Sequence, residues 1–139
     1  MSKAIITILK ADATLTTLLG SSDKVRMNVA SQTQKVPYVV VDIEDVEPTN
    51  AFREASDLDF VRFTVSCVSD RPYTDATRAG AYEVSQAVRN ALDYVSAGTY
   101  GGDVITRCTF ERGGGMQEDR LSDGLRITVD DEYKLSLRR

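Results

Sequence analysis

Apolar residues recur at helical spacing across residues 2–19, in two groups that Asp12 separates. The Asp12 side chain can accept hydrogen bonds from the amides of the turn that follows, so it is the predicted N-cap of a second short helix. Gly20 follows the second group, where a helix commonly ends in the left-handed conformation. The pattern therefore predicts two short helices, whose apolar positions are Ile5, Ile6, Ile8, Leu9, Leu15, Leu18 and Leu19.

The next apolar segments have the period of strands. Residues 25–27 predict a short strand, and the β-branched run at residues 38–43 predicts a strand that is central or covered on both faces. Residues 60–68 alternate strictly between apolar and polar, which is typical of a half-buried strand in an antiparallel sheet. The residues that this alternation places on the buried side are Val61, Phe63, Val65 and Cys67.

The clearest amphipathic pattern in the chain begins near residue 74 and continues to about Val95. Thr74 or Asp75 is the predicted N-cap of this helix. Apolar residues follow at intervals of three and four, which predicts a stripe that packs on a sheet. The residues of the stripe are Val84, Ala87, Val88, Ala91, Leu92 and Val95.

Two further strands complete the pattern, at residues 103–112 and 125–137. The second is predicted to be one long strand with a bulge near its acidic pair, Asp131 and Glu132. Between the strands lie two polar stretches. Residues 44–59 are acidic and rich in turn formers, which indicates either extended strand ends or a protruding loop, and residues 113–124 predict a mobile loop.

The order of elements predicts an α+β fold class. We expect an antiparallel β-sheet with the N-terminal helices and one long amphipathic helix packed on one face. Nothing in the 139 residues resembles an interdomain linker, and the length suits one domain, so the prediction is a single domain over residues 1–139.

Composition argues against most catalytic chemistry. The chain has no histidine, which removes the commonest general base and metal ligand, and a net charge of −4 gives no general attraction for nucleic acid. The two cysteines, Cys67 and Cys108, lie in strand patterns and are expected to be buried and reduced. No apolar run is long enough for a membrane span, so we expect a protein made and acting in the cytoplasm. We predict no enzyme, no cofactor and no metal.

Three motifs have a possible chemical role and a simpler explanation. Gly113–Gly115 lacks the Gly-Lys-Ser/Thr ending of a phosphate-binding loop and is followed by two acids. Asp130, Asp131 and Glu132 are adjacent in a strand, so their side chains do not converge on one ion. The acids of residues 44–59 have Arg53 among them and Arg62 close by, and they favour a solvated loop or a subunit interface.

The order and spacing of these segments resemble those of the phage tail completion (tail terminator) proteins. The similarity covers nearly the whole chain. The segments that carry it are Ile8–Ala13, Leu18–Gly20, Val36–Val41, Arg62–Cys67, the helix with Val84 and Leu92, Thr99–Gly102, and the closing strand from Leu125 to Leu137.

This resemblance implies a structural protein of the virion tail, assembled in the host cytoplasm. Members of the family are expected to form a ring, usually hexameric, at the head-proximal end of the tail tube. The implied partners are other copies of the chain, the tail tube protein and the head–tail connector protein, with DNA passing only through the lumen and no membrane. Two alternatives stay open: another phage structural protein, such as a tail tube or head completion protein, and a small α+β ligand-binding domain.

A ring requires a head-to-tail contact that closes after a fixed rotation, and sheet edges and protruding loops can supply it. We expect the contacts in residues 45–58, in the 112–124 segment and in the C-terminal strand. Apolar residues in otherwise polar loops are candidate anchors, and charged residues flank them. The candidate interface residues are Phe52, Arg53, Glu54, Arg112, Met116, Arg120, Leu121, Arg138 and Arg139.

Overall fold

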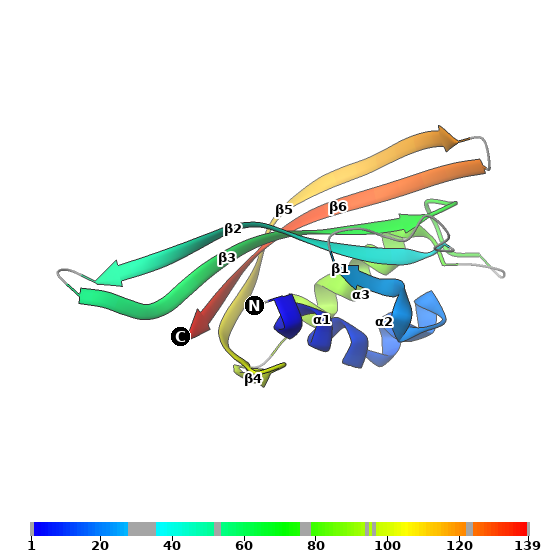
Figure 1. Cartoon of the computed structure of the whole chain (residues 1–139). Helices are drawn as coiled ribbons and strands as arrows, with labels where there is room; N and C mark the ends of the chain where they lie inside the picture. The colour runs from blue at the N-terminus through cyan, green and yellow to red at the C-terminus, as the bar shows by residue number, and fades with distance from the viewer. Residues whose placement is uncertain are drawn as a thin grey trace.

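The computed structural model describes residues 2–27, 36–51, 54–75, 79–93, 95, 97–121 and 124–138. For residues 2–3, 45–51, 54–59 and 121 it describes the backbone alone. Six strands form one sheet in the order β1-β2-β3-β6-β5-β4, and the helices lie together on one side of it (Figure 1).

The N-terminal helices α1 (Ser2–Ala11) and α2 (Ala13–Leu19) have the predicted caps. The Leu15 amide donates to Oδ1 of Asp12 over 2.8 Å, and Gly20 closes α2 with a positive φ of 86°. A single turn of 3₁₀ helix, η1 (Ser22–Lys24), leads into strand β1 (Val25–Met27). The prediction of two short helices followed by a short strand is confirmed.

One apolar core lies between the helices and the sheet. The alternation in β3 (Glu54–Ser69) buries the predicted residues from Val61 to Cys67, and β6 (Gly124–Arg138) buries every second residue in the same way. Tyr133 of β6 stands at the centre, with its ring 5.5 Å from Phe63 and 5.6 Å from Phe110. Helix α3 (Ala81–Asp93) covers this core with its predicted apolar stripe, of which Val84, Ala87, Val88 and Leu92 are buried.

The predicted fold class is wrong in two respects, the proportion of sheet to helix and the type of sheet. The protein is mostly sheet, with short helices, and the sheet is mixed and curled into a half-barrel. Strand β1 runs parallel to β2 (Tyr38–Ala51), pairing Val25 with Val39 and Met27 with Val41. The remaining strands pair antiparallel. A three-residue strand has too little pattern to show its direction, so the sequence could not distinguish a parallel partner from an antiparallel one.

The predicted long helix is also wrong at its start, because α3 begins at Ala81 and not near Thr74. The residues before it form a turn whose carbonyl groups satisfy the first helical amides. The Ala81 amide donates to the Arg71 carbonyl and the Tyr82 amide to the Pro72 carbonyl, each over 3.0 Å. Thr74 caps the turn, since its hydroxyl accepts from the Gly80 amide over 3.0 Å. The helix is therefore 13 residues long.

Both polar stretches continue as paired strands and form two hairpin arms. Strands β2 and β3 pair out to Ala51 and Glu54, and β5 (Asp103–Leu121) pairs with β6 out to Leu121 and Gly124. Figure 1 shows that the two arms leave the sheet in opposite directions. Extended strand ends are therefore the correct alternative for residues 44–59, and the prediction of a loop at 113–124 is wrong.

The predicted bulge lies opposite the acidic pair, in β5 and not in β6. The register jumps from Gly113, opposite Asp131, to Met116, opposite Val129. A Cβ at Gly114 would lie 2.5 Å from the Asp130 carbonyl oxygen, so this close approach requires glycine. The three glycines thus form a β-bulge that kinks strand β5.

Each arm has one outer edge that no described strand covers. Strand β4 (Gly98–Tyr100) pairs with residues 103–105 of β5 alone, and β1 pairs with residues 39–41 of β2 alone. In the described part of the chain, β5 from residue 106 and β2 from residue 42 therefore have unpaired outer edges. Such edges are available for pairing with another strand.

Candidate assembly interface

The structure distributes the predicted interface residues over both arms. Glu54 begins β3 and Leu121 ends β5, so each lies at the end of one hairpin, and the two hairpins point in opposite directions (Figure 1). Three of the predicted residues, Phe52, Arg53 and Arg139, lie outside the described residues. The predicted set is thus divided between two surfaces and does not form one patch.

The described arginines of the set, Arg112, Arg120 and Arg138, are exposed on the sheet. Arg112 makes an ion pair of 3.2 Å with Glu132, and Arg120 lies 3.7 Å from Glu118. Arg138 is exposed at the end of β6. Exposed pairs of this kind contribute little to stability, so the side chains of Arg112 and Arg120 can exchange these pairs for contacts with another molecule.

Met116 lies in a groove of about 380 Å³ between helix α3 and the β5–β6 arm. We call this the α3–β5 groove. Helix α3 forms one wall and the kinked part of β5 forms the other. The residues that line it are Tyr82, Ser85, Gln86, Arg89, Phe110, Gly113, Gly115, Met116, Val129 and Asp131.

The exposed large apolar side chains of the described residues gather at this groove. They are Tyr73, Tyr82 and Met116, which are 63%, 44% and 43% exposed. The rings of Tyr73 and Tyr82 lie 6.0 Å apart, and Tyr82 and Met116 both line the groove. Clustered exposed apolar groups of this kind mark interaction sites.

Sequence reasoning found Met116 and missed the two tyrosines. Tyr82 stands on the same side of α3 as Gln86 and Arg89, which the helical pattern assigns to solvent. The sequence therefore contained a signal for Tyr82, because an aromatic residue on the polar face of an amphipathic helix indicates a contact surface. Tyr73 had no such signal, because it lies in a turn whose path the pattern does not show.

A buried carboxyl group supports the floor of the groove. The Ser85 hydroxyl donates to Asp131 over 2.6 Å, and Asp131 is only 6% exposed. Burial raises the pKa of Asp131, while the Ser85 hydrogen bond and the charge of Arg89 act in the opposite direction. Arg89 also lies 4.0 Å from the centre of the Phe110 ring and bonds to Asp93. These contacts fix the wall of the groove that α3 provides.

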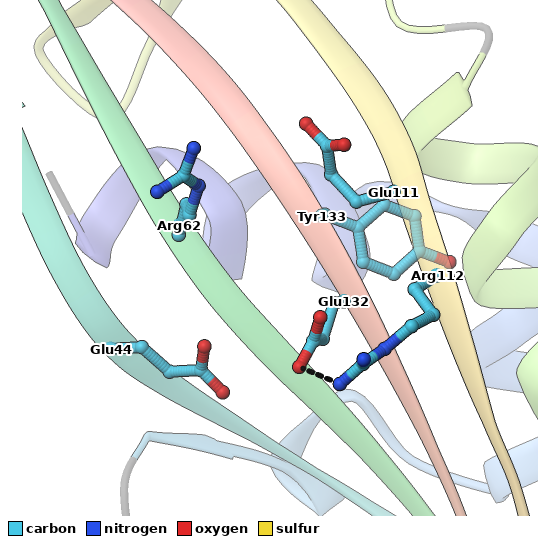
Figure 2. Close-up of a pocket in the computed structure, with 6 residues that line it drawn as sticks. All are labelled: Glu44, Arg62, Glu111, Arg112, Glu132 and Tyr133. Atoms are coloured by element: carbon cyan, nitrogen blue, oxygen red, sulfur yellow. Dashed lines mark hydrogen bonds and ion pairs between the residues drawn. The ribbon is translucent and has the colours of Figure 1, made fainter.

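The opposite face of the sheet is polar, with charges of both signs. A depression of about 280 Å³ lies there, and Figure 2 shows that its lining residues come from β2, β3, β5 and β6. Glu44 accepts a hydrogen bond from Thr64, and on β6 the Lys134 ammonium lies 4.3 Å from the Phe60 ring centre. The residues that line the depression are Glu44, Arg62, Glu111, Arg112, Glu132 and Tyr133.

Within the described ranges, no three acidic or cysteine side chains lie close enough together to hold a metal ion. No helix in the same ranges has the length and apolar character to cross a membrane.

Residues 3–130 match the protein family described as tail completion protein gp17. The chain belongs to this family. A tail completion protein is a structural protein of phage tails, so this chain is a component of the virion tail. The prediction that the chain is similar to the tail completion proteins is confirmed.

The fold of this tail completion protein is similar to that of a chain in the virion of a native gene transfer agent particle. The TM-score is 0.68 at 22% sequence identity, and the similarity covers 98% of this chain and 92% of the other. No curated protein matches the sequence. The similarity to the gene transfer agent chain establishes a shared fold over almost the full length of both chains.

Proposed function

We propose that this tail completion protein is a tail terminator: its copies form a ring, expected to be hexameric, that caps the tail tube and joins it to the head connector. The observation that carries the proposal is the pair of opposed hairpin arms, each with an unpaired outer edge. Membership of the tail completion family supports the position of the ring at the head-proximal end of the tail.

The arrangement of the edges favours a ring over a two-fold dimer. The free edge of β2 and the free edge of β5 belong to different arms that point in opposite directions (Figure 1). A contact between them joins two different surfaces, which is a head-to-tail contact. Repeated head-to-tail contacts close into a ring when the rotation per copy divides a full turn.

In this fold, the surfaces that would contact other proteins are separate from the apolar core. The single helical layer covers one face of the sheet, and the other face carries the polar depression of Figure 2. In the proposed ring, the arms make the contacts between copies, and the tail tube protein and the connector protein bind the two ends. DNA passes through the lumen without a specific site.

The test uses the pure protein, alone and mixed with tail tube protein, with light scattering for mass and negative-stain microscopy for shape. We expect single rings of one size, and we expect their addition to halt the elongation of tubes. Monomers alone in the presence of tail tube protein would contradict the proposal. Long tubes from the pure protein would show that it is a tube subunit instead.

A further inference from the structure

We propose that the α3–β5 groove binds the β2–β3 arm of the neighbouring copy in the ring. By the β2–β3 arm we mean the paired backbone of residues 44–51 and 54–59. This inference rests on the proposed ring and names the surface by which one copy holds the next.

The apolar surface of the groove is the first argument. Tyr82 and Met116 line the groove with nearly half of each side chain exposed, and Tyr73 extends the same surface beyond Tyr82. Covering these side chains removes apolar area from water, which favours association. Aromatic side chains at such positions are commonly the residues on which an interface depends most.

The backbone of β5 is the second argument. The groove lies against the kinked part of β5, where Gly113 and Gly115 line it. Without side chains at these two positions, an incoming strand can approach the β5 backbone closely. The Phe110 amide already donates to the Asp93 carboxylate over 3.3 Å, so a second strand can add to the edge of β5 beyond this residue.

Charge is the third argument. Residues 44–59 contain six acids and one arginine, whereas the rest of the chain is close to neutral. The groove presents Arg89, which also pairs with Asp93 over 3.3 Å, and the acid in its lining, Asp131, is buried and hydrogen-bonded to Ser85. An acidic strand therefore meets a cation and no exposed carboxylate in the groove, which favours this arm over a neutral or basic segment.

The shape of the molecule excludes the chain's own arm as the occupant. The β2–β3 arm extends to one side of the sheet, whereas α3 and the kinked part of β5 lie on the other side (Figure 1). A copy therefore cannot place this arm in its own groove. The arm can reach the groove of a copy placed beside it, which gives the head-to-tail contact of a ring.

The direct test is covalent cross-linking across the contact. One variant combines Ala51→Cys on the arm with Gln86→Cys in the groove, and a second combines Thr49→Cys with Gln86→Cys. A short bismaleimide is expected to give a ladder of covalent multimers up to the size of the ring.

The matched control replaces Gln86→Cys by Asn90→Cys, which is exposed on the same helix outside the groove. Single-cysteine variants control for the native thiols, Cys67 and Cys108, which are buried. The expected result is a ladder with Gln86→Cys and no ladder with Asn90→Cys. Rings seen by light scattering without a Gln86→Cys ladder would overturn this inference and leave the proposed function intact. Absence of rings in the unmodified protein would overturn both.

A second measurement tests the apolar surface. Tyr82→Ala is expected to raise the concentration at which rings dissociate by about tenfold, because it removes a central aromatic contact. The control is Asn90→Ala, which is expected to leave that concentration unchanged. Thermal unfolding of the monomer verifies that both variants fold. An unchanged dissociation concentration for folded Tyr82→Ala would show that the groove is not the contact.

Discussion

Asp131 shows how a single residue can oppose the stability of the fold that contains it. Its position in β6 places it on the same face as Tyr133 and Leu135, so a carboxyl group is buried among apolar side chains. Only the Ser85 hydroxyl donates to it in the described contacts. Burial favours the protonated form, and the hydrogen bond favours the ionised one.

We predict that Ser85→Ala lowers the free energy of unfolding at neutral pH by about 1–3 kcal/mol, because it leaves the buried Asp131 carboxylate without its donor. Chemical denaturation of the monomer measures the change. The control is Ser22→Ala, in an exposed turn, which is expected to have little effect. A loss no larger than that of Ser22→Ala would contradict the importance of the buried hydrogen bond.

The pH dependence of Asp131→Asn provides a separate prediction. The pKa of Asp131 is raised above its unfolded value of 3.8, so the folded state holds this proton more tightly than the unfolded chain does. The stability that the protonated carboxyl contributes is present below the unfolded pKa and is lost as the pH rises through the folded pKa.

Asparagine stays neutral throughout, so Asp131→Asn should gain stability relative to the original protein as the pH rises from 3.8 towards neutrality. Urea midpoints of both proteins across this range measure the difference. Other acids titrate in both proteins alike and cancel in the comparison. A difference that is constant or that shrinks as the pH rises would show that the pKa of Asp131 is not raised.

At the scale of elements, the junction before α3 depends on a glycine. A Cβ at Gly80 would lie 2.3 Å from the Tyr73 carbonyl carbon and 2.6 Å from the Thr74 nitrogen, both in the backbone. Backbone atoms cannot rotate away as a side chain can, so the turn of residues 70–75 would have to move off the helix. The amides at the start of α3 would then lose the turn carbonyls that they bond.

We therefore predict that Gly80→Ala destabilises the protein by about 1–3 kcal/mol or more. Gly98→Ala is the matched control, because its Cβ would meet the Tyr100 ring at 3.7 Å, an ordinary contact. Denaturation of the two variants side by side measures the difference. Equal stabilities would mean that the turn and the helix pack less closely than described.

The elements also show where sequence patterns can and cannot predict structure. Alternation identified β3 near Val61 and β6 near Leu135 because one face of each strand is buried there. In β5, residues 111–120 are exposed on both faces. Nothing selects apolar residues at alternate positions of such a strand, so residues 113–121 have the composition of a loop. The apolar surface at the groove was only partly predictable. Met116 was visible as an apolar residue in a polar segment, whereas the turn that places Tyr73 next to Tyr82 was not.

At the scale of the molecule, one core joins both ends of the chain. Cys67 of β3 and Cys108 of β5 belong to the same apolar cluster as α1 and α3 residues. Burial raises the pKa of Cys108 to about 12, and it also raises the pKa of Cys67 well above its usual value. Neither thiol is therefore available as a thiolate in the folded protein. Both cysteines are free and buried, which confirms the prediction.

We predict that both cysteines react with a thiol reagent only when the whole core opens, and that they react at the same rate. Labelling in increasing urea, with mass spectrometry to separate the two sites, measures this. The rates should follow the global unfolding transition seen by circular dichroism. Faster labelling of Cys108 alone would show that β5 detaches from the core before the rest of the protein unfolds.

The opposed directions of the two hairpin arms have a consequence for polarity. A closed circle in which an arm of each copy inserts into the groove of the next contains no two-fold axis that exchanges its upper and lower rims. The rims of such a circle must therefore differ chemically, although every copy is identical. A proposed terminator with these arms would thus distinguish head from tail through the direction of its own backbone, without a second kind of subunit.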